Sequence, residues 1–387
     1  MILVPLFLAS LSAAATFPFE IASNKPWVPV SLDGSAPQWF ILDTGNRGTT
    51  LIARECADRL KLEHGPEQAL EIGAGAGAKV TLSTAVRPVF LRALGDTLTI
   101  GSAPFVTFEH ISAVEGRRLD GSLGYDFLSR HVVEIDYAHR QVTMRDTTDF
   151  VPPSGATIVP VDLETGWAIA EGTISLKGRD PMPCRLIVDT GVRFTIALFQ
   201  PFCEKYELHD VAGNLSDLVV GAGVGGLSRG DVGRLETLTL GPISFSRPVA
   251  VFSRDSKGIF AMDGPDGIIG GELLKHYRTT FDYPHGRLIL EPYGESPTFE
   301  FDMSGLFLAA DPPSFRNVRV LSVNPRTPAA QAGLKHGDEI LSIDGKRTPE
   351  LTLEQARALL RTPGTRQLQV LRSGQLQRVI LKSRRLV

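Results

Sequence analysis

The stretch ILDTGNRGTTLI at residues 41–52 returns as IVDTGVRFTIAL at 187–198, which places Asp43 and Asp189 at equivalent positions. Two more segments repeat with the same displacement of 146 residues: DGSLGYDFL at 120–128 with DGIIGGELL at 266–274, and IDYAHR at 135–140 with FDYPHG at 281–286. Three motifs that keep one displacement indicate a duplicated domain, so we expect two halves with the same fold.

Each half is rich in short runs of β-branched and aromatic residues that are separated by Gly, Pro and Asp turns. This pattern predicts a mainly β fold. Apolar residues at helical spacing predict one helix at 53–62 and another at 199–208, each shortly after an Asp-Thr-Gly triplet. Glycine clusters follow at 72–78 and 220–226. They lack the strand-then-helix pattern and the Gly-Lys-Ser/Thr ending of phosphate loops, so we interpret them as hairpins that close over a substrate.

Two equivalent loops that each carry one carboxylate suit peptide-bond hydrolysis by a shared pair of aspartates. Like charges about 3 Å apart cannot both ionise, so such a pair holds one proton. The ionised member takes a proton from an attacking water, and the protonated member hydrogen-bonds the developing oxyanion. This chemistry needs no cofactor. We assign catalysis to Asp43 and Asp189, and support of the pair to Thr44, Gly45, Thr190 and Gly191.

Each half resembles the retropepsin-like aspartic protease domain found in retroviruses and in many bacterial exported proteins. The shared signature is an apolar strand, Asp-Thr-Gly, a helix, a glycine-rich flap and an apolar-apolar-Gly segment, which falls here at 122–124 and 268–270. The resemblance covers about residues 18–292 and implies two β-barrel halves that form an intramolecular pseudo-dimer. It also implies six flap glycines: Gly73, Gly75, Gly77, Gly221, Gly223 and Gly225.

An arginine stands two positions after each motif glycine, where pepsin-type enzymes carry Ser or Thr. A guanidinium beside the carboxylates would favour their ionisation and disturb proton sharing. We therefore expect Arg47 to pair with Asp126 and Arg193 to pair with Glu272, each on the second helix of its own half.

Asp136 and Asp282 each precede a Tyr and a His, which would also suit a second acid and base set. Asp before a turn is ordinary turn chemistry, so we favour a structural role and expect His139 and His285 on the surface. No Cys/His cluster has the spacing of a zinc site, and we expect no metal.

A further unit that lies outside the repeat begins after the segment PYGESPTF at 292–299. It resembles a bacterial PDZ domain in the segments TPAA at 327–330, AGL at 332–334, GDEI at 337–340, IDG at 343–345 and PG at 363–364. That family adds an extended peptide as a strand and binds its terminal carboxylate with backbone amides. The resemblance places peptide binding at Gly305, Leu306, Phe307 and Leu308, although Leu306 and Phe307 also suit plain core positions.

Residues 2–11 form an apolar run, and Ala13-Ala14-Ala15 fits a signal-peptidase site, so we expect cleavage after Ala15 and export to a periplasm or the cell exterior. No Lys or Arg precedes the run, which leaves a wrong start codon or a buried strand as alternatives. No other stretch approaches the ~18 apolar residues of a membrane span. The net charge of −3 gives no basic field for nucleic acid.

The expected organisation is a signal peptide at 1–15, two halves at 16–150 and 156–296, and a PDZ domain at 301–387. Among the three cysteines, Cys184 and Cys203 form a candidate disulfide, with buried free thiols as the alternative. We expect an aspartic endopeptidase whose PDZ domain binds substrate or partner peptides. The alternative is a peptidase fold without turnover that acts as a binding protein through its PDZ groove.

Overall fold

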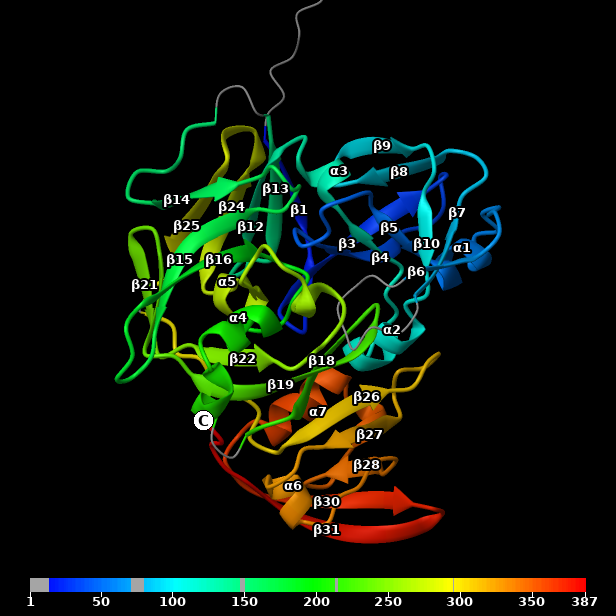
Figure 1. Ribbon diagram of the computed structural model, residues 1–387. Coiled ribbons are helices and arrows are strands. Elements are labelled where there is room, and N and C mark those ends of the chain that lie inside the picture. Colours follow the sequence, from blue (N-terminus) through cyan, green and yellow to red (C-terminus); the bar gives the residue numbers. More distant parts are fainter. Residues whose placement is uncertain (1–13, 71–79, 147–149, 213–214, 295) are drawn as a thin grey trace, which may run out of the picture.

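The computed structural model describes residues 14–70, 80–146, 150–212, 215–294 and 296–387. The described chain is mainly β, as predicted, and forms two similar halves with a smaller C-terminal unit against both (Figure 1). The first half is blue to cyan, the second green to yellow, and the C-terminal unit orange to red (Figure 1).

The first half is built around a strongly curved sheet. Its elements are β2 (Glu20–Ala22), β3 (Lys25–Leu32), β4 (Gln38–Leu42), β5 (Leu51–Ala53), α1 (Arg54–Arg59), β6 (Gln68–Leu70), β7 (Val80–Thr84), β8 (Val89–Ala93), β9 (Asp96–Ile100), β10 (Pro104–Val106), α2 (Glu109–Glu115), β11 (Gly121–Leu123) and α3 (Tyr125–Leu128). The strand order is β6-β7-β10-β5-β11-β4-β3-β8-β9, with β2 beside β3. In β8 the buried and exposed residues alternate, as expected for a strand with one face on the core.

The second half repeats this arrangement. Its elements are β15 (Ile169–Ser175), β16 (Met182–Val188), β17 (Ile196–Leu198), α4 (Gln200–Lys205), η1 (Leu208–Ala212), β18 (Leu218–Gly223), β19 (Gly226–Arg234), β20 (Thr237–Leu240), β21 (Ile243–Ser246), β22 (Val249–Ser253), η2 (Ile259–Ala261), β23 (Gly267–Ile269) and α5 (Gly271–Leu274). The two helices predicted after the motifs are present but short. Lys61 and Glu207, at equivalent positions, follow them with positive φ and end both.

An antiparallel sheet joins the two halves. Its elements are β1 (Ala15–Pro18), β12 (Val132–Asp136), β13 (Gln141–Arg145), β14 (Thr157–Asp162), β24 (Tyr277–Asp282), η3 (Tyr283–His285) and β25 (Arg287–Pro292), in the strand order β1-β13-β12-β24-β25-β14. At its centre Glu134 pairs with Thr280, its own equivalent in the repeat. A pseudo-two-fold axis therefore passes between β12 and β24 and relates the two halves. This is the symmetry expected of the predicted pseudo-dimer.

The C-terminal unit is a six-stranded sheet with helices. Its elements are β26 (Leu306–Ala310), β27 (Val318–Val323), α6 (Pro328–Gln331), β28 (Glu339–Ile343), β29 (Lys346–Arg347), η4 (Thr348–Glu350), α7 (Leu353–Leu360), β30 (Gly364–Arg372) and β31 (Gln375–Ser383). The main strand order is β26-β27-β28-β30-β31, so β26 is an edge strand. A capping box between Thr352 and Gln355 fixes the start of α7.

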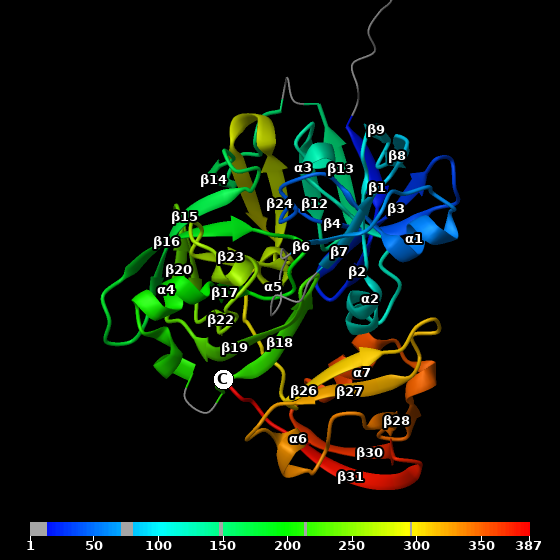
Figure 2. The ribbon, with the colours of Figure 1, turned by 45° about the vertical axis from the view of Figure 1, so that its right-hand side comes forward.

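The core of the two halves is one continuous cluster that runs from Phe19 to Phe299, whereas the C-terminal unit has a core of its own. A small third cluster, Val114, Val219 and Phe307, joins all three parts. The two views of the ribbon both place α2 directly above β26 and α7 (Figures 1 and 2). The C-terminal unit therefore docks on both halves.

All three cysteines are buried free thiols, so the disulfide considered between Cys184 and Cys203 is not formed. Cys184 lies on β16, whereas Cys203 lies on α4 and donates to the Leu198 carbonyl at 3.5 Å. Burial raises the pKa of each thiol to about 12.

The expected leader lies almost wholly outside the described residues. Ala15 is the first residue of β1 and pairs with Met144, so cleavage after Ala15 would remove one strand residue. In the described ranges, no helix is long and apolar enough to cross a membrane.

Candidate active site

Two buried apolar strands position the paired aspartates. Asp43 follows β4 and Asp189 follows β16, and each strand has a parallel neighbour, β11 or β23, from the later motif of its half. The Asp43 amide donates to Leu123 O at 3.1 Å, and the Asp189 amide donates to Ile269 O at 2.9 Å. The two loops are thus held by equivalent backbone hydrogen bonds.

Thr44 and Thr190 lock the two loops together across the two-fold axis. The Thr44 amide donates to Thr190 Oγ1 at 3.1 Å, and the Thr190 amide donates to Thr44 Oγ1 at 3.0 Å. Each hydroxyl also donates across the interface, Thr44 to Val188 O at 2.8 Å and Thr190 to Leu42 O at 2.5 Å. These four buried hydrogen bonds bring the aspartates face to face.

Only glycine fits beside the two carboxylates. A Cβ on Gly45 would lie 2.0 Å from Asp189 Oδ2, and a Cβ on Gly191 would lie 2.4 Å from Asp43 Oδ1. Each glycine amide also donates to the carboxylate of its own loop, at 3.1 Å for Gly45 and 2.6 Å for Gly191. The glycines therefore allow the close approach that a shared proton requires.

The two carboxylates have unequal surroundings. Burial raises the pKa of Asp189 well above its usual range, and the charge of Asp43 raises it further. On the other side, Ser122 Oγ donates to Asp43 Oδ2 at 2.7 Å. The equivalent residue in the second half is Ile268, which has no hydroxyl. The surroundings thus favour a neutral Asp189, whereas only Asp43 receives a hydroxyl donor from the later motif of its half.

The predicted ion pairs of Arg47 and Arg193 are wrong, since neither is present among the ion pairs of the described residues. The carboxylate of Asp126 is already satisfied, because it accepts from the amide and the hydroxyl of Thr50 at 2.9 and 2.8 Å. Arg47 instead stacks on the indole of Trp167, with its guanidinium carbon 4.2 Å from the ring centroid.

Arg193 turns toward the C-terminal unit. It donates to Val220 O at 3.0 Å, and its guanidinium carbon lies 5.2 Å from the ring centroid of Phe307. Glu272, its expected partner, pairs instead with Lys275 at 2.8 Å and accepts from the side-chain Nδ2 of Asn24 at 2.7 Å. Neither arginine therefore neutralises the acid that its position suggested.

The flap glycines of the second half lie in one hairpin. Gly221 and Gly223 belong to β18, and Gly225 lies in the turn that leads to β19. The predicted flap glycines of the first half, Gly73, Gly75 and Gly77, lie outside the described residues. Beneath the β18–β19 hairpin, next to Gly191, is a cavity of about 40 Å³.

Asp136 and Asp282 hold the central sheet together. Burial alone would raise the pKa of Asp136, but hydrogen bonds from His139, Tyr293 and Arg278 outweigh burial and lower it to about 2. Asp282 pairs with His285 at 2.7 Å and with Arg287. The two histidine side chains are 66% and 44% exposed.

These aspartates therefore have the structural role that we favoured. Across the described residues, no three His, Cys, Asp or Glu side chains are grouped so that they could hold a metal ion.

The residues predicted for peptide binding in the C-terminal unit lie at its junction with the halves. Gly305 has a φ of +81°, Leu306 is partly buried, and Phe307 and Leu308 are each 3% exposed. The Gly305 amide donates to the carboxylate of Asp302. Peptide binding at this loop stays a prediction.

Sequence reasoning missed three contacts around the aspartates. Ser122 could have been found, because a serine stands where the other half has isoleucine. The Trp167 indole N–H donates to Gly45 O at 2.7 Å, from the second half to the first loop. Lys25 and Glu115 form a buried ion pair at 2.9 Å, and the charge of Lys25 reaches Asp189. These long-range contacts leave no motif in the sequence.

Models of known families match both halves and the C-terminal unit. Residues 28–127 and 172–273 each match the aspartyl protease family, and residues 319–371 match the PDZ domain family. Among solved structures, the crystal structure of an aspartic proteinase from Irpex lacteus is similar, with a TM-score of 0.45 and 14% identity over 72% of this chain and 97% of that chain. No curated protein matches. Because the two segments together span more than half of its residues, the chain belongs to the aspartyl protease family, and it carries a PDZ domain after the repeated halves.

Proposed function

We propose that the protein is an aspartic endopeptidase that hydrolyses peptide bonds with the pair Asp43 and Asp189. The observation that carries this proposal is the reciprocal pair of hydrogen bonds between Thr44 and Thr190, which holds the two carboxylates in contact. No step of this reaction needs a group from outside the chain other than water and substrate.

In the proposed mechanism, Asp43 is the base and Asp189 holds the proton. The hydroxyl of Ser122 stabilises the ionised form of Asp43, and burial beside a second carboxylate keeps Asp189 neutral. Asp43 takes a proton from the water as that water attacks the peptide carbonyl, and Asp189 donates a hydrogen bond to the oxygen that becomes negative. The tetrahedral intermediate then collapses as Asp43 passes the proton taken from the water to the leaving nitrogen, which returns Asp43 to its ionised form.

The substrate is an extended polypeptide in this proposal, and the β18–β19 hairpin covers it from the side of the second half. The PDZ domain supplies a second site for a protein or peptide partner. We also propose that the protein is exported, which rests on the apolar run at 2–11 and the alanines that follow it.

The test is digestion of a denatured, alkylated protein between pH 3 and 7 by the wild type, Asp43→Asn and Asp189→Asn. Loss of the base or of the proton donor should lower the rate by at least ~10³-fold. Asp180→Asn, an exposed aspartate of the second half, is the matched control and should keep full activity.

The proposal fails if folded wild type and Asp43→Asn digest the substrate equally slowly over this range. The protein would then be a binding protein with a peptidase fold, acting through its PDZ domain.

A further inference from the structure

A short segment of the first half lies against both walls of the peptide groove of the PDZ domain. In this family an added peptide lies between the edge strand and the long helix, which are β26 and α7 here. The last turn of α2, residues 112–116 of the first half, lies against β26. Its Val114 packs on Phe307, and a Cβ on Gly116 would lie 2.4 Å from Leu353 Cβ on α7. Both walls of the groove thus touch this turn.

Arg357 of α7 fastens the turn to the groove. Its Nη2 donates to Val114 O at 2.5 Å and to Leu308 O on β26 at 2.9 Å. The Leu308 carbonyl lies in the strand that an incoming peptide would pair with. Arg357 is 7% exposed, and its nearest carboxylate oxygen, on Glu354, is 4.0 Å away. It is therefore a buried guanidinium whose hydrogen bonds go to neutral oxygens.

The junction carries more positive than negative charge. Lys25, Arg193 and Arg357 surround the buried carboxylate of Glu115, and Arg361, Glu354 and Asp302 also act on Arg193. Within the described part of the chain, Glu115 Oε2 has no hydrogen-bond partner, while Oε1 pairs with Lys25 at 2.9 Å. Buried charges are stable only when they are paired. A carboxylate that enters beside Arg357 would give this guanidinium a charged acceptor in place of neutral oxygens.

The backbone amides of the loop before β26 already have hydrogen-bond acceptors within the same loop. The Ser304 amide donates to Asp302 Oδ2 at 3.1 Å, and the Gly305 amide donates to the same oxygen. The Leu306 amide donates to Ser304 Oγ at 3.1 Å. The side chain of Asp302 thus occupies amides that a terminal carboxylate would otherwise bind.

The same junction holds the hairpin that covers the active site. The amide of Val219 in β18 donates to Asn324 Oδ1 of the PDZ domain at 3.1 Å. At the hairpin tip, His110 Nε2 of α2 hydrogen-bonds to Gly223 O at 2.8 Å. Displacement of α2 would break the second contact and loosen the hairpin.

We propose that the last turn of α2 is an internal occupant of the PDZ groove, and that a peptide with a free C-terminal carboxylate and an aliphatic last residue displaces it and frees the β18–β19 hairpin. The aliphatic residue replaces Val114 on Phe307, and the carboxylate pairs with Arg357. The effect on turnover rests on the proposed function, whereas the occupancy of the groove does not.

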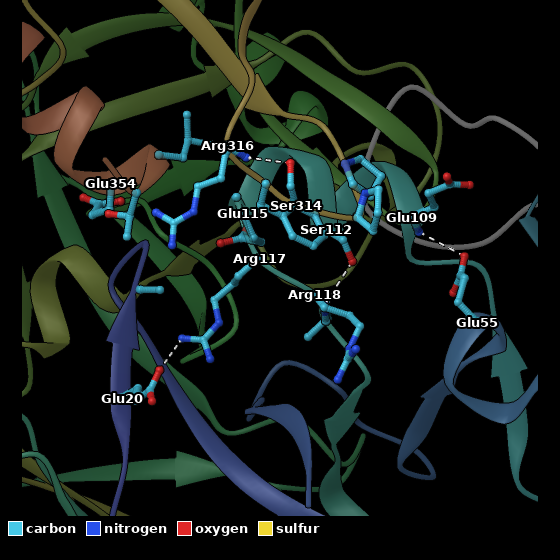
Figure 3. A pocket seen from close by; sticks show the side chains of 18 of the residues that line it. Glu20, Glu55, Glu109, Ser112, Glu115, Arg117, Arg118, Ser314, Arg316 and Glu354 are labelled. Atoms are coloured by element: carbon cyan, nitrogen blue, oxygen red, sulfur yellow. Dashed lines mark hydrogen bonds and ion pairs between the residues drawn. The ribbon is translucent and has the colours of Figure 1, made fainter. Parts of the chain in front are cut away.

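A cavity of about 680 Å³ gives such a peptide room to extend. A strand added antiparallel to β26, with its carboxylate beside Arg357, would run past Ala310 toward Pro312. Pro312 lines this cavity together with Glu115 of α2 and Glu354 at the start of α7. Figure 3 shows the side chains around this space, with Arg117 paired to Glu20 at one side. The cavity thus continues the groove where the peptide would leave it.

The first test measures binding by fluorescence anisotropy, with a labelled peptide that ends in Leu-Val and has a free carboxylate. Val114→Lys in the full chain places a cation beside Arg357 and Arg193, which should expel the turn and raise the affinity at least tenfold. Ala113→Lys adds the same charge at the neighbouring, half-buried position and should bind as the wild type does. The amidated peptide should bind weakly to all three. Equal affinities of Val114→Lys and wild type, or no binding to either, would overturn the proposal.

The second test uses unaltered protein and so does not depend on the folding of a variant. Saturating free-carboxylate peptide should increase deuterium exchange of α2 and of residues 218–226, and the amidated peptide should not. Binding without any change in these segments would also overturn the proposal. If wild type cleaves no substrate, the proposed function fails. Deuterium exchange of α2 then still tests whether this helix occupies the PDZ groove. If wild type does cleave substrate, the peptide should increase kcat/KM, and an unchanged kcat/KM would refute the link to the hairpin.

Discussion

Ser122→Ala tests the assignment of roles within the aspartate pair. The change removes the hydroxyl that donates to Asp43 Oδ2 at 2.7 Å and leaves the Gly45 amide on Oδ1. Lys25, Tyr137 and Tyr283 also act on the pair, and the variant alters none of them. Any change in titration therefore reports the lost hydroxyl.

The size of the effect follows from the charge of the acceptor. A hydrogen bond to an ionised group contributes about 1.5–3 kcal/mol, and one pH unit corresponds to about 1.4 kcal/mol. Without the donor, the base is protonated at higher pH, so the acidic limb of the pH profile of kcat/KM should move upward by about 1–2 units. Activity well above this limb should change much less.

The assay is kcat/KM for an internally quenched peptide measured at intervals across the acid range. Ser122→Thr keeps the hydroxyl on a residue that suits a strand and should restore the wild-type limb. Ile268→Val changes the equivalent position of the other half and should leave the limb in place. If folded Ser122→Ala has the same acidic limb in its pH profile as the wild type, the Ser122 hydroxyl does not determine which aspartate is the base. That result would refute the reasoning.

Three further predictions concern stability and thiol chemistry. Thr44→Val removes the hydroxyl that bonds to the Val188 carbonyl and to the Thr190 amide and leaves both groups buried without that partner. The free energy of unfolding, measured with urea, should therefore fall by about 3 kcal/mol. An unchanged midpoint would show that these hydrogen bonds do not hold the two loops together. Because the pKa of Asp136 is lowered to about 2 in the fold, its stabilisation is complete above its unfolded pKa near 3.8 and is lost as pH falls through 2. The free energy of unfolding of the wild type should therefore fall by roughly 2 kcal/mol between about pH 4 and 2, and that of Asp136→Asn should not. If the free energies of both proteins changed equally with pH, Asp136 would not have this stabilising role. Finally, Ellman's reagent should react with no thiol in native protein and with three thiols after unfolding. If only one thiol reacted after unfolding, the other two cysteines would form a disulfide, and the prediction would be wrong.

Much of the active site could be predicted because it depends on local motifs that the duplication displays twice. Asp43 and Asp189 stand at one displacement, and the strands and glycines around them belong to the same motifs. The partner of Arg47 could not be predicted, since it depends on Trp167, which arrives from the other half. Spacing along the chain says which residues are equivalent but not which surfaces meet.

The docking of the PDZ domain illustrates the same limit. Its motifs predict a groove, yet they do not reveal that α2 packs against β26 and α7, because the fit depends on the shape of both partners. Gly116 allows the close contact with Leu353 only in the assembled chain. Before assembly it is one more glycine that ends a short helix.

The register in which Glu134 meets its own equivalent, Thr280, has a consequence for how the two halves can change over time. In an enzyme made of two identical chains, every substitution appears on both sides of the axis. Here a single codon affects one side only. Ser122 can serve one aspartate while Ile268 stays apolar, and the PDZ domain can contact one hairpin without a second copy competing for the other. Covalent fusion thus allows selection to act on each half separately.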